Sequence, residues 1–192
     1  MRIKNPDEIC VLVNKENWLP KDYIPKDLIK PKVDFLPDTN EEAMLLRKEV
    51  ARALEKLFKK AKKEKVYLYA VSGFRSFERQ REIFKNNFRK DGEKANKYSA
   101  RPGQSEHQTG LSMDITCEKN EFLLSEEFSN TKEYKWLSEN AYKYGYIIRY
   151  PKEKEEITGY NFEPWHIRYV GNKLAEELYI RKITLEEYFL NK

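Results

Sequence analysis

The sequence predicts a single α+β domain in which a small antiparallel sheet is flanked by helices. The chain has 192 residues, which is enough for one domain with a hydrophobic core and short for two. Aromatic residues make up 14% of the chain and supply large apolar side chains to bury, which argues against a disordered chain. Helical and strand-like segments are mixed without the strict β-α-β alternation of a parallel sheet, which favours the α+β class.

Residues 1–38 are predicted to form an extended, proline-rich arm packed on the domain that residues 39–192 form. The arm and the domain are expected to make one compact unit, because the arm carries too many apolar side chains to leave in water. Its prolines are Pro6, Pro20, Pro25, Pro31 and Pro37. Its apolar side chains include those of Trp18, Leu19, Tyr23, Ile24, Leu28 and Phe35.

Five helices are predicted from apolar residues at helical spacing and from residue types that cap helix ends. They are residues 39–63, opened by a capping box at Thr39–Glu42; residues 76–92, capped by Ser76; residues 131–144, stopped by Gly145; and two closing helices capped by Asn172 and by Thr184, the latter with a capping box to Glu187.

Four strands are predicted between these helices, from short β-rich runs that end at turn residues. They cover residues 65–72, 111–116, 146–150 and 166–170. Residues 99–110 are rich in residues that break regular structure and are expected to be a loop.

The charge pattern favours no nucleic-acid partner. The formal net charge is +5, and the densest basic cluster lies in residues 59–65, at the end of the first predicted helix. Lysines in a last helical turn suit the helix dipole and face solvent, and no base-reading motif accompanies them. Attraction to an anionic surface such as a cell wall remains open.

No apolar run is long enough to span a membrane, and the N-terminus lacks the apolar core of a signal peptide. Composition therefore leaves two alternatives, a cytoplasmic protein or a chain numbered after a removed export segment. The two cysteines, Cys10 and Cys117, are expected to be buried free thiols rather than a disulfide, and no Cys-x-x-Cys pair suggests a zinc site on them.

The two histidines of the chain, His107 and His166, are the residues that point to chemistry. So small a number excludes a histidine-rich metal site. Asp114 follows His107 by seven residues and lies between apolar neighbours in a predicted strand, where an unpaired charge would be costly. Two histidines and one aspartate match the three protein ligands of a catalytic zinc site, and Glu163 could then accept a proton from water. Spacing alone supports a metal site and a chance arrangement equally.

Longer motifs around these residues resemble those of a known enzyme family. Residues 105–114, Ser-Glu-His-Gln-Thr-Gly-Leu-Ser-Met-Asp, and residues 163–166, Glu-Pro-Trp-His, are similar to the SxHxxGxxxD and ExWH motifs of the D-Ala-D-Ala carboxypeptidases. This is the VanY and LdcB type of zinc peptidase, in peptidase family M15. Residues 72–76 with Gln80 resemble the family's upstream segment, and the resemblance extends in order over residues 11–180. Ser112 stands where the family often has alanine, a small residue for a small one.

The resemblance implies one zinc ion per chain and a role for each residue of the site. It assigns His107, Asp114 and His166 as zinc ligands, Glu163 as the catalytic base, Arg75 as the partner of the substrate's terminal carboxylate, Gln80 and Ser105 as contacts of the terminal D-residue, and Tyr150 and Tyr160 as pocket-lining residues or plain core aromatics. A guanidinium suits a carboxylate because it offers a bidentate fork.

The implied activity is zinc-dependent removal of a C-terminal D-alanine from peptidoglycan stem peptides, as a D,D- or an L,D-carboxypeptidase. The alternatives are a D-Ala-D-Ala dipeptidase, an endolysin-type endopeptidase, a peptidoglycan-binding module without activity, and a basic nucleic-acid binder. A monomer is expected, located outside the membrane or at the cell wall of a bacterium, with an export or anchor segment trimmed from the mature domain.

Overall fold

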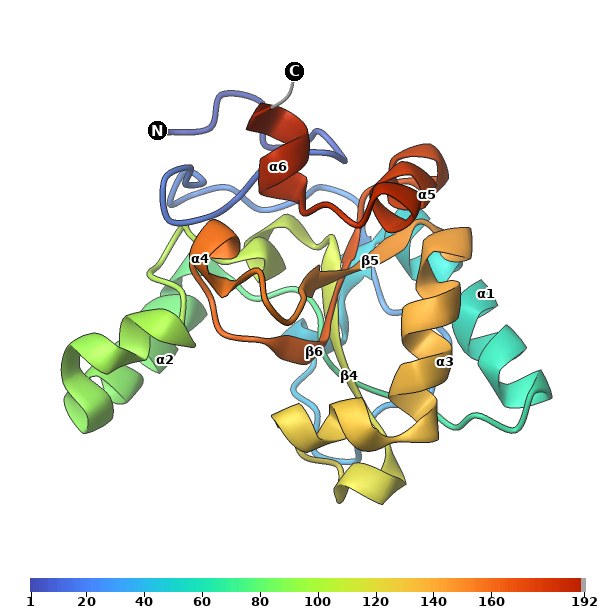
Figure 1. The fold of residues 1–192 in the computed structure, drawn as a ribbon. Coiled ribbons are helices and arrows are strands. Elements are labelled where there is room, and N and C mark those ends of the chain that lie inside the picture. Colours follow the sequence, from blue (N-terminus) through green and yellow to red (C-terminus); the bar gives the residue numbers. More distant parts are fainter. Residues whose placement is uncertain (191–192) are drawn as a thin grey trace.

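The computed structural model describes residues 1–190 and confirms the α+β class, with a four-stranded antiparallel sheet at its centre (Figure 1). The order of the strands is β3-β4-β6-β5. They span Tyr69–Ser72 (β3), Ser112–Thr116 (β4), Tyr146–Tyr150 (β5) and Glu163–Tyr169 (β6). A separate two-stranded pair joins Leu28–Ile29 (β1) to Leu46–Arg47 (β2).

Helices surround the sheet, with α1 and α3 on one side and α2 on the other (Figure 1). The α-helices are Lys48–Lys63 (α1), Phe77–Asp91 (α2), Lys132–Asn140 (α3), Glu155–Thr158 (α4), Asn172–Arg181 (α5) and Leu185–Leu190 (α6). Short 3-10 turns occupy residues 42–44, 92–97, 106–109, 118–120, 126–130 and 141–144.

The hydrophobic core lies between the sheet and the helices α1 and α3. Strand β4 shows why one face of the sheet is apolar and the other polar. Met113 and Ile115 are fully buried in the core, whereas Asp114 between them points the opposite way, because successive side chains of a strand alternate between its faces. The polar face of β4 is therefore available for a site.

One predicted helix start and one predicted helix cap are wrong. The helix predicted from residue 39 begins at Lys48, because residues 46–47 are extended and pair with β1. The predicted capping box does not form, since the carboxylate of Glu42 accepts the backbone N–H of Ser76 instead. Asn172 is the first residue of α5 but makes no side-chain cap. The predicted caps at Ser76 and Thr184 are confirmed, since their hydroxyls accept the N–H groups of residues 79 and 187.

Three predicted segments have shifted limits, and the strand of residues 146–150 is confirmed. The strand predicted from residue 65 begins at Tyr69, and the helix predicted over 131–144 turns into a 3-10 turn after Asn140. The strand predicted from residue 166 begins at Glu163, which brings Glu163 and His166 onto one strand. The predicted loop of residues 99–110 contains a 3-10 turn at 106–109 whose four residues are all buried.

The N-terminal segment contacts the domain at several points. Val13 and Leu19 are buried in the core, β1 pairs with β2, and Phe35 forms a bridge to Ala70 of β3. The division into an arm of residues 1–38 and a domain of residues 39–192 stays a prediction.

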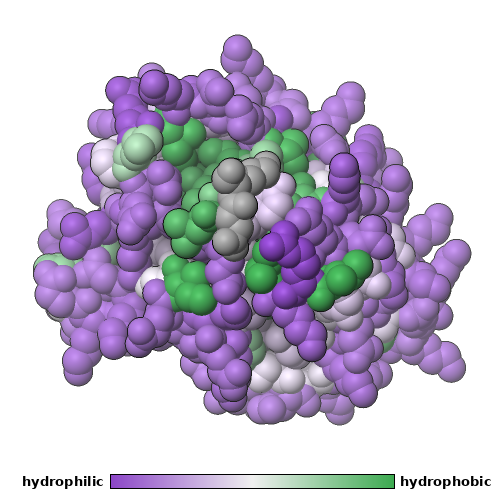
Figure 2. Space-filling view, turned by 45° about the horizontal axis from the view of Figure 1, so that its top comes forward, coloured by the Kyte–Doolittle hydropathy of each residue, from purple (hydrophilic) through white to green (hydrophobic). Residues whose placement is uncertain are grey.

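Both cysteines are free thiols, with Cys117 buried and Cys10 only partly buried. Among residues 1–190, no helix combines the length and the apolar character that a membrane crossing needs. On the face drawn in Figure 2, hydrophilic residues dominate and apolar residues gather mainly in the central and upper part of the view, in a chain of which 36% of the residues are charged.

Candidate metal centre and active-site cavity

The sheet register brings two of the predicted ligands side by side. Asp114 of β4 lies directly opposite His166 of β6, and on its other side it is paired with Ser72 of β3. Residues directly opposite each other in an antiparallel sheet share a face. The side chains of Asp114 and His166 therefore meet on the polar face of the sheet, although 52 residues separate them in the sequence.

An irregularity in β6 places Glu163 on the same side of the sheet as His166. In a regular strand, two residues three positions apart point to opposite faces. Between the pairs Ile148–Ile167 and Tyr150–Glu163, however, β5 advances by two residues and β6 by four. Such a bulge redirects side chains, and both Glu163 and His166 line one cavity.

His107 reaches the same place from the 3-10 turn of residues 106–109, which ends at Gly110. Gly110 has a φ of +65°, a left-handed backbone conformation that favours glycine, and a Cβ there would lie 2.9 Å from a side-chain carbon of Leu28. The ring is fixed by the carbonyl of Gly73, which accepts the Nδ1–H of His107 at 2.7 Å.

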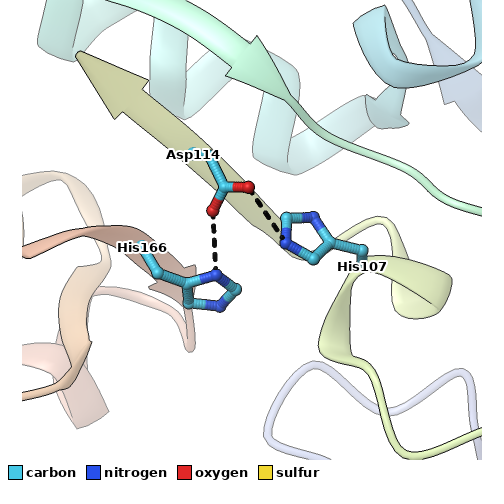
Figure 3. A group of neighbouring side chains, drawn as sticks. All are labelled: His107, Asp114 and His166. Atoms are coloured by element: carbon cyan, nitrogen blue, oxygen red, sulfur yellow. Dashed lines mark hydrogen bonds and ion pairs between the residues drawn. The ribbon is translucent and has the colours of Figure 1, made fainter. Parts of the chain in front are cut away.

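The three predicted ligands form a group that can hold a metal ion (Figure 3). Each side chain offers one ligand atom, and these atoms all lie within 4.8 Å of one another. The Oδ2 of Asp114 is 3.3 Å from Nε2 of His107, and its Oδ1 is 3.0 Å from Nδ1 of His166. Two imidazoles and one carboxylate are the donor set of many catalytic zinc sites, so the residues present fit a zinc ion.

The electrostatics of Asp114 and His107 favour a bound cation, whereas His166 holds its proton until a metal displaces it. Burial alone would raise the pKa of Asp114, but the two histidines hold that pKa well below its usual range, so the carboxylate is charged. Burial lowers the pKa of His107, which favours the neutral ring that binds metals. Burial also acts to lower the pKa of His166, but hydrogen bonds to Asp114 and Glu106 raise it to about 9.

All nine residues that the sequence singled out line one cavity of about 180 Å³. The metal-binding group lies on its wall with Glu163, and the proposed substrate contacts surround them. The nine residues are Arg75, Gln80, Ser105, His107, Asp114, Tyr150, Tyr160, Glu163 and His166. A larger groove of about 670 Å³ adjoins this cavity and shares Arg75 and Ile83 with it.

Arg75 is held in the cavity wall by three neighbours. Its guanidinium donates to the side-chain oxygen of Gln80 at 2.8 Å and to the hydroxyl of Ser72 at 3.0 Å, and it lies 3.8 Å from the carboxylate of Asp114. Gln80 in turn donates to the carbonyl of Ala100 at 2.6 Å. Both ends of the Gln80 amide are therefore occupied, and in this structure its main contact is with Arg75.

Glu163 is partly buried, and burial raises the pKa of its carboxyl group to about 8. Within residues 1–190, no group donates a hydrogen bond to this carboxylate. A carboxyl group with a pKa near neutrality can both take up and give back a proton at the pH of a cell.

The remaining predicted residues differ in the contacts that their side chains make. The ring of Tyr150 packs against His166 with 5.0 Å between centroids, so Tyr150 supports a ligand as well as lining the cavity. Ser105 is buried at the cavity wall. The hydroxyl of Tyr160 is buried without any hydrogen-bond partner among residues 1–190.

Sequence reasoning missed a cluster of four buried charges behind His166. Glu106 accepts from Arg149 and Arg168, and Arg149 also forms two hydrogen bonds with Glu186. Burial would raise the pKa of Glu106, but the two guanidinium groups hold it well below its usual range. Glu106 stands inside the first motif, yet its partners lie far along the chain, so the sequence carried no signal for the cluster.

Comparison with known proteins gives consistent matches over most of the chain. A family model described as VanY, D-alanyl-D-alanine carboxypeptidase, matches residues 43–172. A Bacillus subtilis protein described as a carboxypeptidase, YodJ, is 52% identical over 188 residues, which cover 97% of this chain and 69% of that protein.

Two solved structures show the same fold. The structure of the LdcB LD-carboxypeptidase has a TM-score of 0.94 and 52% identity, and the match covers 98% of this chain and 88% of that one. The structure of a vancomycin-resistance D,D-pentapeptidase, VanY, in complex with Zn(II), has a TM-score of 0.73 and 33% identity over 94% of this chain and 98% of that one.

Proposed function

Since the chain belongs to the VanY family of D-alanyl-D-alanine carboxypeptidases, we propose that it is a zinc-dependent carboxypeptidase that removes a C-terminal D-alanine from peptidoglycan stem peptides. The observation that carries this proposal is the group of His107, Asp114 and His166, which lies beside Glu163 and Arg75 in one cavity. A ligand set, a proton carrier and a carboxylate-binding group are the three parts that a metallocarboxypeptidase needs.

His107, Asp114 and His166 would hold one zinc ion per chain. When bound there, zinc supplies Lewis-acid polarisation of the scissile carbonyl and lowers the pKa of water. Through the hydrogen bond to the Gly73 carbonyl, His107 presents Nε2 to this position, and Asp114 contributes the negative charge.

Glu163 acts as the general base and then as the general acid. Its carboxylate takes a proton from the attacking water and returns it to the nitrogen of the departing D-alanine. The absence of any donor to this carboxylate within residues 1–190 leaves both oxygens free for that exchange. Burial raises the pKa of Glu163 above its ordinary value, which favours uptake of the proton from water.

Arg75 binds the terminal carboxylate of the substrate and thereby selects a chain end. Gln80 and Ser72 hold its guanidinium from behind, which reduces the entropy lost on binding. Ser105 and the unpartnered hydroxyl of Tyr160 offer further hydrogen bonds to the terminal D-residue. Tyr150 packs on His166 and closes the cavity beside it.

The tetrapeptide stem is the first candidate substrate. The LD-carboxypeptidase LdcB is 52% identical to this chain, against 33% for the D,D-pentapeptidase VanY, so the likeness favours L,D activity. The adjoining groove, lined in part by Phe35, Val71 and Phe122, has room for the part of the stem that precedes the scissile bond. We further expect the chain to act as a monomer at the cell wall, outside the bacterial membrane.

Mass spectrometry of muropeptides after digestion tests this proposal. Loss of one D-alanine from a tetrapeptide indicates L,D activity, and loss from a pentapeptide indicates D,D activity. Loss of a D-Ala-D-Ala unit would indicate a dipeptidase, and cleavage within cross-links an endopeptidase. Zinc binding with no cleavage of any of these would contradict the proposal and leave a binding module.

A further inference from the structure

We propose that Glu106 is a positioning residue of the metal site, whose carboxylate accepts the Nε2–H of His166 and so holds the ring with Nδ1 facing Asp114 and the metal. This inference rests on the zinc site proposed above. The relevant contacts are 3.4 Å from Oε2 of Glu106 to Nε2 of His166 and 3.0 Å from Oδ1 of Asp114 to Nδ1 of His166.

The hydrogen-bond pattern of Glu106 leaves it only one way to interact with His166. Its Oε1 accepts from Arg149 at 2.8 Å and from Arg168 at 2.6 Å. Two guanidinium groups on one oxygen keep the carboxylate an acceptor, so Oε2 can only receive a hydrogen from His166. The hydrogen of the neutral ring must therefore be on Nε2, which leaves the lone pair of Nδ1 for the ion.

The cluster around Glu106 is balanced and closed. Arg149, Arg168, Glu106 and Glu186 contribute two positive and two negative charges, and their side chains are between 0% and 8% exposed. Arg168 also donates to the backbone carbonyls of Ile9 and Val11, which ties the cluster to the N-terminal segment. Glu106 is thus fixed from behind and cannot follow a rotation of the imidazole ring.

The two histidines are consequently held in opposite tautomers. His107 carries its hydrogen on Nδ1, where the carbonyl of Gly73 accepts it, and presents Nε2. His166 carries its hydrogen on Nε2 and presents Nδ1. Histidine ligands of metal sites commonly donate their other ring N–H to a carboxylate or a carbonyl. Removing that acceptor typically weakens metal affinity by about 10- to 100-fold.

The informative substitution is Glu106→Gln, which keeps the size of the side chain. The two arginines need an oxygen, so the glutamine amide is expected to turn its NH₂ toward His166. Nε2 then has to accept, the hydrogen moves to Nδ1, and the ligand position is blocked. The matched control is Glu186→Gln. Glu186 carries the same charge in the same cluster, where its carboxylate accepts two hydrogen bonds from Arg149, but it makes no contact with His166.

Zinc affinity is measured by competition with a chromophoric chelator. We expect Glu106→Gln to weaken zinc binding by about 10- to 100-fold and Glu186→Gln to keep the wild-type affinity. Equal affinities in wild type and Glu106→Gln would overturn the inference, and so would an equal loss in both variants. Thermal unfolding of the metal-free proteins shows whether each variant folds.

A second measurement needs no variant. The chain has only two histidines, so ¹⁵N-histidine NMR of the zinc-loaded wild type resolves both rings. Opposite tautomers are expected, with the hydrogen on Nδ1 of His107 and on Nε2 of His166. A hydrogen on Nδ1 of His166 would overturn the inference even if Glu106→Gln fails to fold. A wild type that binds no zinc would instead refute the proposed function.

Discussion

The buried charge cluster around Glu106 and the polar groups that line the active-site cavity are built in opposite ways. Behind His166, the charges of Glu106, Arg149 and Arg168 are paired with one another or with backbone carbonyls and are closed to solvent. In front of it, the carboxylate of Glu163 has no hydrogen-bond donor within residues 1–190, and the hydroxyl of Tyr160 has no partner there either.

This difference separates what holds the site from what acts on a substrate. The groups of a closed and neutral cluster already have their hydrogen-bond partners, so they hold neighbouring side chains in place and gain no hydrogen bond from a ligand. Unpartnered polar groups that line a cavity gain hydrogen bonds when a ligand binds. Replacing Glu106, the member of the cluster that contacts His166, should therefore change metal binding. Replacing the unpartnered groups that line the cavity should change turnover or KM. The following predictions test that division, from the largest expected effect to the smallest.

Removing a ligand should have the largest effect. In His107→Ala, we expect the zinc content to fall from roughly one ion per chain to a trace, with loss of turnover, because two side chains cannot complete a catalytic site. Metal analysis of the purified protein measures it. Asn87→Ala is the control, since Asn87 lines the same cavity without belonging to the ligand group, and it should keep its zinc. Full zinc occupancy in His107→Ala would contradict the ligand assignment.

Removing the proton carrier should leave the metal in place. Glu163→Gln is expected to keep its zinc and lose about 10²- to 10⁴-fold in kcat, the usual contribution of general acid–base catalysis. Steady-state kinetics on a tetrapeptide stem, with zinc content measured on the same sample, checks it. Retained turnover would show that another group carries the proton.

Weakening the carboxylate contact should act on KM. Arg75→Lys loses the bidentate fork, a loss of about 1.5–3 kcal/mol for hydrogen bonds to a charged group. That corresponds to a rise in KM of about 10- to 100-fold. A substrate with a C-terminal amide is the control, because the wild type should bind it poorly and Arg75→Lys should bind it no worse. An undiminished preference for the free carboxylate in the variant would refute the pairing.

The raised pKa of Glu163 makes the stability of the metal-free protein depend on pH. Burial raises this pKa from its ordinary value of 4.5 to about 8, so between those values the folded chain holds a proton that the unfolded chain has lost. The stability that this group contributes is complete below pH 4.5 and is lost as the pH rises toward 8.

In Glu163→Gln the buried side chain is neutral at every pH, so it adds no pH dependence to the free energy of unfolding. With a chelator present, we expect this variant to be more stable than the wild type at pH 8.5 by about 1–3 kcal/mol and to show little difference at pH 4.5. Urea unfolding at the two pH values gives both free energies. A constant difference across this range would mean that Glu163 is ionised without cost in the folded chain.

The smallest effect is expected at Tyr160. Its hydroxyl has no partner in the described chain, so Tyr160→Phe should change the free energy of unfolding by less than about 0.5 kcal/mol. KM should rise by about 2- to 10-fold if the hydroxyl binds the substrate. Tyr146→Phe is the opposite control, since that hydroxyl donates to the carbonyl of Val50 at 2.7 Å, and its loss should lower stability and leave KM unchanged. An unchanged KM in Tyr160→Phe would make Tyr160 a core aromatic.

The front of the cavity was largely predictable from the sequence. The motifs around His107 and Glu163 are local, and the resemblance that they carry named the nine residues that line the cavity. The strand that holds Glu163, however, was predicted to begin only at residue 166. The convergence of Asp114 with His166, however, follows from strand register, which the sequence alone did not provide.

The back of the cavity was not predictable, because its parts are distant in the chain. Glu106, Arg149 and Glu186 look like ordinary surface charges until the fold buries them together. The misplaced start of α1 has a related cause, since residues 46–47 pair with β1 rather than follow their helical pattern. In both cases a long-range contact overrides a local preference.

The digestion of a purified tetrapeptide muropeptide, followed by mass spectrometry, tests the central claim most directly. The zinc-loaded chain should release one D-alanine and leave the rest of the stem intact. The release should stop when a chelator removes the metal, resume when zinc is restored, and be absent in Glu163→Gln. An intact tetrapeptide and pentapeptide after incubation with zinc-loaded protein, or a cleavage that survives removal of the metal, would contradict the assignment as a zinc carboxypeptidase.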